Sequence, residues 1–133
     1  MKISGGCHCG KISYSADADP RKALICHCSD CQVMSGSVFR TIIFVPDHEF
    51  NLEKGKLKNY IKIADSGNRR VMAFCENCGS HIYATDVGDA PKVLGIRLGT
   101  CDQRADIKPM QQYYCSSKMA WVDEIDSIAV MEK

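Results

Sequence analysis

The sequence predicts a mainly β domain of short antiparallel strands with little helix. Segments of about four to eight residues, either apolar throughout or alternating between apolar and polar, are separated by glycine, proline and polar turn residues. No stretch has the period of a long amphipathic helix. Seven of the nine cysteines fall into three tight clusters, which indicates that bound metal pins the strands together.

The strongest strand signal is the run VFRTIIFV at residues 38–45, which is rich in β-branched and aromatic side chains. Pro46 ends the run, because proline cannot donate a hydrogen bond to a neighbouring strand. We expect a strand of this composition to lie in the middle of a sheet.

Weaker signals place the other strands. Residues 50–52 and 57–63 are expected to form one hairpin, and residues 71–74 and 82–84 a second hairpin with a cysteine pair at its tip. In chain order, strands are expected at residues 11–16, 23–25, 38–45, 50–52, 57–63, 71–74, 82–84, 93–99 and 112–115.

The remaining segments are turns or short helical pieces. Residues 1–10 hold the first cysteine pair in a glycine-rich turn. Residues 29–34 are expected to close into one helical turn that ends at Gly36. Residues 119–130 are too mixed for an assignment.

Length and charge restrict the functional classes. With 133 residues the chain has the length of one domain, which we place at residues 1–133. The formal net charge is +1 and the lysines and arginines are scattered, so no nucleic acid partner is expected. No apolar run approaches about eighteen residues and no apolar segment follows Lys2, so we expect no membrane partner and a soluble, cytoplasmic protein.

The cysteines favour metal over disulfides. Their number is odd and no secretion signal precedes them, and reducing compartments keep thiols free. Neighbouring thiols in a Cys-x-Cys pair are also poorly placed for an unstrained disulfide.

The middle cluster, CHCSDC at residues 26–31, supplies three thiols from Cys26, Cys28 and Cys31. A structural zinc is closed by four protein ligands, whereas a catalytic zinc keeps three and leaves one position open. We call these cysteines the three-thiol cluster. An open position on zinc suits thiol chemistry, because zinc stabilises a bound thiolate or polarises a carbonyl oxygen. Both roles suit the addition of a thiol to an aldehyde.

The outer two pairs complete a set of four. We call Cys7, Cys9, Cys75 and Cys78 the four-thiol cluster. A shared metal would tie the start of the chain to its middle, and the binding energy would then contribute to folding. The spacing leaves open a second pairing, in which the middle cluster is completed from Cys7 and Cys9.

The clusters and the segments around them resemble the glutathione-dependent formaldehyde-activating enzymes, a family that includes S-(hydroxymethyl)glutathione synthase and centromere protein V. The resemblance covers nearly the whole chain. It rests on GGCHCGKISY at residues 5–14, CHCSDCQ at 26–32, SGSVFRTIIFVP at 35–46, RRVMAFCENCGSHIY at 69–83, GIRLGTCD at 95–102 and SSKMAWV at 116–122.

The resemblance implies a β-tent fold of antiparallel sheets with two zinc ions. The four-thiol cluster would hold the structural zinc, and the three-thiol cluster the catalytic one. The implied activity is that of a carbon-sulfur lyase that joins formaldehyde to glutathione, so the expected partners are a small-molecule thiol such as glutathione and an aldehyde. In this mechanism zinc binds the thiolate or polarises the aldehyde, and water shuttles the proton.

Other interpretations stay open at the sequence level. The second zinc could be purely structural, the protein could be a zinc-stabilised binding module without turnover, or the three-thiol cluster could be a sensor that cycles between zinc-bound and disulfide states. His8 and His27 lie between the cysteines and are expected to point away from the metal. Four arginines are candidates for the carboxylates of a glutathione-like ligand, although arginines on strands are commonly solvated or paired: Arg40, Arg69, Arg70 and Arg97.

Overall fold

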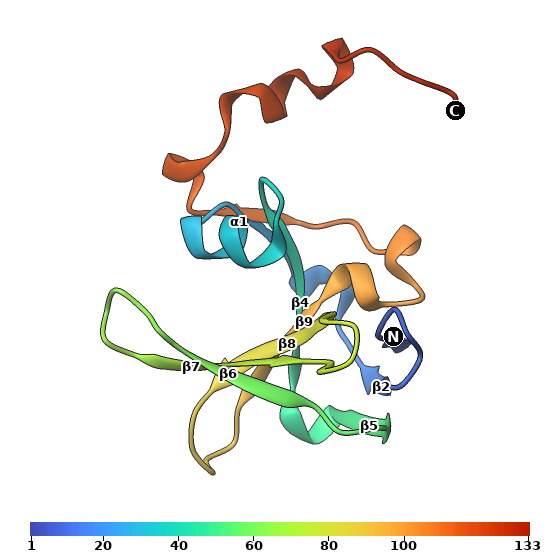
Figure 1. Ribbon diagram of the computed structural model, residues 1–133, viewed down its shortest axis with the longest axis vertical. Coiled ribbons are helices and arrows are strands. Elements are labelled where there is room, and N and C mark those ends of the chain that lie inside the picture. Colours follow the sequence, from blue (N-terminus) through green and yellow to red (C-terminus); the bar gives the residue numbers. More distant parts are fainter.

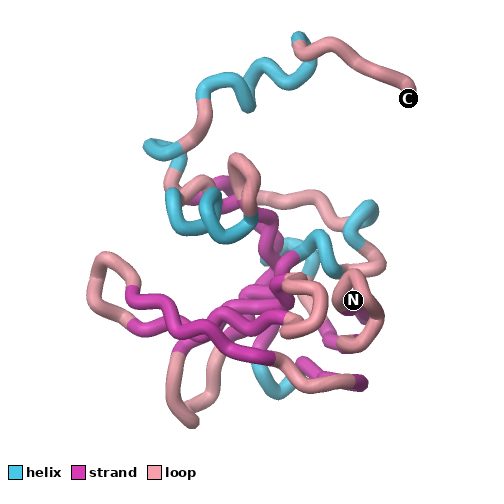
Figure 2. Tube along the Cα trace, in the orientation of Figure 1, coloured by secondary structure: helices cyan, strands magenta, loops and turns pink.

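The computed structural model describes residues 1–133 and forms two sheets and one α-helix (Figure 1). A three-stranded sheet has the order β1-β2-β5, and a seven-stranded sheet has the order β10-β3-β4-β9-β8-β7-β6. Figure 2 shows the strands gathered at the centre, with helical turns around them and along the C-terminal segment. The mainly β prediction is confirmed.

Most boundaries lie within a few residues of those expected from the sequence. The strands are β1 (Lys2–Gly6), β2 (Ser13–Asp17), β3 (Ala23–Cys26), β4 (Arg40–Pro46), β5 (Phe50–Lys54), β6 (Lys58–Ile63), β7 (Arg69–Phe74), β8 (His81–Asp86), β9 (Val93–Arg97) and β10 (Gln111–Tyr113). The helix is α1 (Ser29–Ser35), and 3-10 turns cover Pro20–Lys22, Asp47–Glu49, Leu98–Thr100, Arg104–Asp106, Cys115–Ser117 and Ala120–Ser127.

Strand β4 lies inside the larger sheet, between β3 and β9, as its composition predicts. Its side chains alternate between two environments. Ile43 and Val45 are fully buried in the main core, while Ile42 packs with Leu24 and Cys26 in a smaller cluster. Both faces of β4 are therefore buried, one in the main core and the other in the smaller cluster.

The main core lies where the two sheets meet, and three aromatic rings join them. Tyr14 of β2 stacks on Phe50 of β5 with ring centroids 5.4 Å apart. Phe50 also meets the edge of Tyr83 on β8, again at 5.4 Å. Such contacts add to the stabilisation that comes from burying apolar area.

The prediction that residues 50–52 and 57–63 form a hairpin is wrong. Strand β5 pairs with β2 in the smaller sheet, and β6 pairs with β7 in the larger one. The chain crosses between the sheets at Gly55, where φ is +88° and an added Cβ would lie 2.2 Å from the Lys11 carbonyl oxygen. Both strands thus find antiparallel partners elsewhere, and the glycine permits the close crossing.

Two further features differ from the expectation. Residues 2–6 form a strand instead of a turn, and the glycines in it serve close packing, because a Cβ on Gly5 would lie 2.2 Å from the Thr100 carbonyl oxygen. Strand β10 pairs with β3 in parallel, the single exception in an antiparallel arrangement. The second expected hairpin, β7 with β8, is confirmed.

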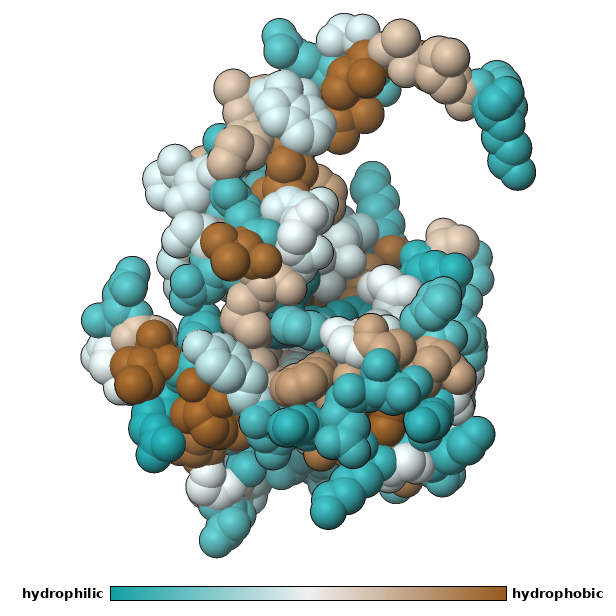
Figure 3. Space-filling model, viewed as in Figure 1, coloured by the Kyte–Doolittle hydropathy of each residue, from teal (hydrophilic) through white to brown (hydrophobic).

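The C-terminal segment leaves the body of the molecule after β10 and runs away from the sheets (Figure 1). It carries exposed apolar side chains, among them Trp121, Ile125 and Val130, and Figure 3 shows this apolar surface along the segment. No helix in the structure is both long enough and apolar enough to cross a membrane.

Candidate metal centres

The four-thiol cluster forms where the two sheets approach each other. Cys7 and Cys9 follow β1, and Cys75 and Cys78 lie in the turn between β7 and β8. All four Sγ atoms lie within 4.8 Å of one another. Cys9 Sγ is 3.5 Å from Cys7 Sγ and 3.8 Å from Cys75 Sγ. A tetrahedral zinc with bonds of about 2.3 Å to sulfur has S···S edges of about 3.8 Å, so this donor set fits a closed zinc site.

The local backbone supports thiolates at this cluster. The backbone N–H of Ile12 donates to Cys7 Sγ at 3.2 Å, and the Ser80 hydroxyl lies 3.3 Å from Cys78 Sγ. The bond from Ser80, together with backbone N–H groups, lowers the pKa of Cys78 to about 5. A metal-binding cysteine must lose its proton, so these donors favour the ligating form.

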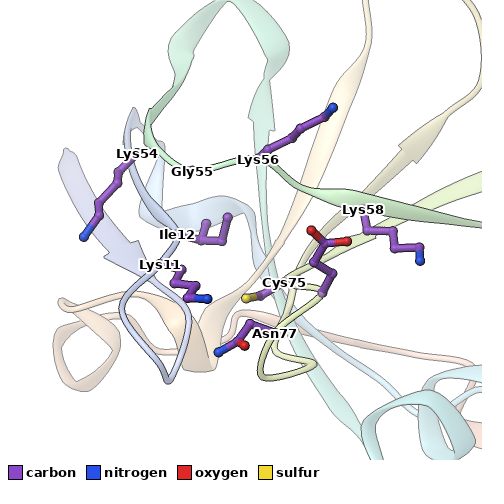
Figure 4. A pocket seen from close by; sticks show the side chains of 9 residues that line it. Lys11, Ile12, Lys54, Gly55, Lys56, Lys58, Cys75 and Asn77 are labelled. Atoms are coloured by element: carbon purple, nitrogen blue, oxygen red, sulfur yellow. The ribbon is translucent and has the colours of Figure 1, made fainter.

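A cavity of about 630 Å³ lies beside the four-thiol cluster, and most of the residues that line it are polar, including four lysines. In Figure 4 the side chains of Lys54, Lys56 and Lys58 point away from one another, as solvated lysines do. Cys75, at 2% exposure, is the cluster's most buried member. The surroundings match those of a closed metal site without a bound substrate.

The three-thiol cluster is assembled by the junction of β3 and α1. Cys26 ends β3, Cys28 caps the N-terminus of α1, and Cys31 lies in its first turn. The Cys28 sulfur accepts the backbone N–H of Cys31 at 3.3 Å, and Gly36 ends the helix at a φ of +63°. The three Sγ atoms lie within 4.8 Å of one another, and no fourth histidine, cysteine or carboxylate joins them.

The thiols of this cluster are electrostatically coupled. The bond between Cys26 and Cys31 lowers the pKa of Cys26 and raises the pKa of Cys31. A bound divalent cation would hold both sulfurs as thiolates. Three thiolates fit a zinc with one position left open.

His27 lies next to the cluster in sequence but is held away from the sulfurs. Its ring is fully buried, with Nε2 2.8 Å from the Gln112 side-chain oxygen and the ring edge-on to Phe39. The Gln32 side chain donates to the carbonyl oxygens of His27 and Ser117 at 2.8 and 2.9 Å. These bonds fix α1 against β3, β10 and the start of the C-terminal segment.

The three-thiol cluster opens onto a cavity of about 560 Å³ on the face of the larger sheet that lies near α1. This volume is typical of sites for small ligands. Apolar residues such as Ile42 and Phe44 line it, with polar groups around them. Two of these groups form ion pairs across elements, Lys62 with Asp30 at 2.9 Å and Arg70 with Asp86 at 2.6 Å.

A second cavity of about 410 Å³ adjoins the first, and Arg97 lines both. Arg40 and His81 also line the smaller cavity. Burial lowers the pKa of Arg97 to about 9, and the positive charge of Arg40 acts in the same direction. Burial, with both arginines, also lowers the pKa of His81.

The structure separates the cysteines into the two sets named above, and the second pairing that the spacing leaves open is not the one formed. All nine cysteines are free thiols; Cys101 lies in the main core and Cys115 is exposed. Sequence reasoning missed Tyr113 and Tyr114, which reach the larger cavity only because β10 joins the sheet beside β3. No local pattern could have indicated that pairing.

Comparisons with known proteins agree with this architecture. A crystal structure of a Rhodobacter sphaeroides protein is similar to this one, with a TM-score of 0.62 and 18% sequence identity over 84% of this chain and 99% of that chain. This likeness concerns the fold alone. No curated protein matches the chain in sequence. The family model described as "Glutathione-dependent formaldehyde-activating enzyme" matches residues 2–117, so the chain belongs to the family of glutathione-dependent formaldehyde-activating enzymes.

Proposed function

We propose that this protein is a zinc-dependent carbon-sulfur lyase that joins a small thiol to an aldehyde, with glutathione and formaldehyde as the reference pair. The observation that carries the proposal is the three-thiol cluster, whose three sulfurs lie together at the wall of a cavity and have no fourth protein donor. We assign a catalytic zinc to this cluster and a structural zinc to the four-thiol cluster.

In the reaction, a bond forms between the thiol sulfur and the carbonyl carbon as the carbonyl π bond breaks and its electron pair moves to the oxygen. One proton leaves the sulfur and another reaches that oxygen. No electrons are gained or lost overall, so no redox partner is needed. Zinc at the three-thiol cluster, when bound, supplies a position that lowers the pKa of a thiol or polarises a carbonyl oxygen.

The protein's own groups bind and orient the reactants. The apolar wall at Ile42 and Phe44 excludes water from one side of the cavity. The Asp30 carboxylate is engaged by the Lys62 ammonium at 2.9 Å. No unpaired buried carboxylate lies at the cluster, so we assign the proton transfer to water.

The first test is zinc and free thiols per chain in protein purified without chelator. We expect about two zinc ions and two free thiols, since seven of the nine cysteines belong to the clusters. About one zinc together with a disulfide among the cluster cysteines would instead support the sensor interpretation.

The second test compares Cys28→Ser with Cys115→Ser. Adduct formation from labelled formaldehyde and glutathione is followed by NMR above the spontaneous rate. We expect Cys28→Ser to lose the acceleration and one zinc while the sheets stay folded. Cys115, which is exposed and outside both clusters, serves as the control and should be replaceable without effect. Unfolding of Cys28→Ser would show that both zinc ions are structural, and wild-type protein without acceleration would contradict the lyase.

A further inference from the structure

Two arginines lie buried on the cavity-lined face of the larger sheet without any acidic partner. Arg40 is 5% exposed and Arg97 is 8% exposed. All three guanidinium nitrogens of Arg40 are buried with no hydrogen bond, and so is Nε of Arg97. Arg97 donates one bond, to the Gly95 carbonyl oxygen at 3.3 Å. Buried charges of this kind are normally paired, and an unpaired one is costly.

Strand register places the pair next to the three-thiol cluster. Arg40 of β4 lies directly opposite Cys26 of β3, and Arg97 of β9 lies opposite Ile42 of β4. Arg97 is therefore the diagonal neighbour of Arg40, within reach of a long side chain. Arg97 lines the larger cavity with the cysteines, and both arginines line the smaller one.

The charge balance at this face leaves the arginines in excess. Arg70 and Lys62 are neutralised by Asp86 and Asp30. No aspartate or glutamate lines the smaller cavity, and Asp65 at the larger one pairs with neither arginine. Three thiolates with one divalent zinc carry about one negative charge, whereas two guanidinium groups carry two positive charges. One positive charge remains for a ligand.

We propose that Arg97, with Arg40 behind it, forms a carboxylate-binding subsite that selects thiols carrying an anionic tail. This inference rests on the proposed function in that the thiol end of the same ligand lies at the three-thiol cluster. The carboxylate enters the smaller cavity and accepts hydrogen bonds from the Arg97 guanidinium. Arg40, whose nitrogens are shielded, adds positive charge from beneath and acts through Arg97.

The lysines beside the four-thiol cluster differ from this pair. Their ammonium groups diverge toward solvent and need no counter-charge (Figure 4). Arg40 and Arg97, in contrast, are buried, and guanidinium nitrogens of both lack a hydrogen-bond partner in the protein. The unsatisfied guanidinium nitrogens therefore distinguish a binding subsite from a merely basic surface.

The test measures binding without turnover. Zinc-loaded protein is titrated calorimetrically with S-methylglutathione, which keeps the carboxylates of glutathione but has no thiol proton to lose. We expect the wild type to bind. The Kd should be at least tenfold higher for Arg97→Gln and intermediate for Arg97→Lys, and the zinc content of both variants should be unchanged. Arg69→Gln is the matched control, because Arg69 is exposed, adjoins Arg70 in β7 and lines neither cavity.

Turnover gives the second readout. The KM for glutathione should rise in Arg97→Gln, whereas the KM for 2-mercaptoethanol, which carries no charge, should not change. Arg40→Met should lower affinity for S-methylglutathione and raise the melting temperature of the ligand-free protein, because a buried unpaired charge is removed.

Contrary results are distinct. If Arg97→Gln loses zinc and its turnover falls equally with glutathione and with 2-mercaptoethanol, the arginines would serve only to balance the charge of the cysteine thiolates. Acetate that binds as tightly as S-methylglutathione would assign the site to free small anions, and no binding by the wild type would overturn the subsite. Arginine-dependent binding without turnover would support the subsite and contradict the lyase. If Arg97→Gln does not fold, Arg97→Lys carries the comparison.

Discussion

The two thiol clusters share a donor type but differ in what surrounds them. The four-thiol cluster joins a loop of the smaller sheet to a hairpin of the larger one, and the lysines Lys54, Lys56 and Lys58 diverge beside it (Figure 4). The three-thiol cluster uses residues from one short stretch, opens onto a cavity and has unpaired arginines beside it. The proposed function accordingly gives the first cluster a role in folding and the second a role in chemistry, although both are built from cysteine.

The largest effect should follow from breaking the four-thiol cluster. We expect Cys75→Ser to lower the free energy of unfolding by at least about 4 kcal/mol, because structural zinc in a closed thiolate site contributes its binding energy to folding. Cys28→Ser should cost far less. The stabilities of the two variants are compared by thermal unfolding monitored with circular dichroism, and the zinc content of each is analysed. Equal destabilisation by both substitutions would remove the distinction between the clusters.

Chelation of the wild-type protein makes the same comparison without substitution. The zinc that we assign to the three-thiol cluster would have fewer protein ligands and would border a cavity, so we expect it to be removed first while the sheets persist. Loss of the second zinc should coincide with unfolding. Zinc release is monitored with a colorimetric chelator while circular dichroism follows unfolding. If the clusters were equivalent, both zinc ions would leave in a single phase that coincides with unfolding.

The approach of β1 to the rest of the core depends on Gly5. An added Cβ there would lie 2.2 Å from the Thr100 carbonyl oxygen and 2.5 Å from the Tyr14 hydroxyl oxygen. We expect Gly5→Ala to destabilise the protein by about 3 kcal/mol, because backbone atoms must move. Gly99→Ala, where an added Cβ meets nothing within 4 Å, is the control and should be near neutral in urea unfolding.

A smaller effect is expected at the helix that carries Cys31. Gly36 ends α1 at a φ of +63° and donates its backbone N–H to the carbonyl oxygens of Gln32 and Val33. Gly36→Ala should cost about 1 kcal/mol, since an alanine is strained in the left-handed region. Gly36→Asn should retain most of the stability. We further expect weaker zinc binding at the three-thiol cluster in Gly36→Ala, measured by chelator competition, without loss of the other zinc.

The smallest effect concerns His81, which borders the smaller cavity. Burial and the two arginines hold its pKa below the ordinary 6.5, so the folded state takes up a proton less readily than the unfolded chain. Its contribution to the unfolding free energy therefore falls as the pH drops below about 6.5 and levels off below the folded pKa. His81→Gln should flatten this part of the profile of unfolding free energy against pH. Comparison with the wild type also corrects for protonation of the thiolates, which both proteins share. An unchanged profile would contradict the lowered pKa of His81.

Much of the candidate site follows from short-range sequence. The spacing of Cys26, Cys28 and Cys31 places three sulfurs at a strand-to-helix junction, since the end of a strand, an N-cap and the first helical turn are local features. The apolar run at 38–45 likewise predicts an inner strand, because its composition suits burial on both faces. In both places the local pattern and the fold agree.

Other features could not be read locally. The separation of β5 from β6 into different sheets depends on partners far away in the chain, β2 and β7, which compete successfully with a nearby hairpin. The burial of Arg40 and Arg97 is also a long-range property, because their strand positions alone are compatible with a solvated or a paired side chain.

The sequence by itself determined the candidate donor atoms, most of the strand segments and the family. The tertiary structure decided which thiols meet, where the cavities lie and which charges are left without partners. The physical reason is that composition and periodicity express the preferences of neighbouring residues, whereas contacts across 66 residues, such as Cys9 with Cys75, depend on how whole sheets pack. Burial also decides what an arginine can do, because a solvated guanidinium needs no partner whereas a buried one calls for a counter-charge.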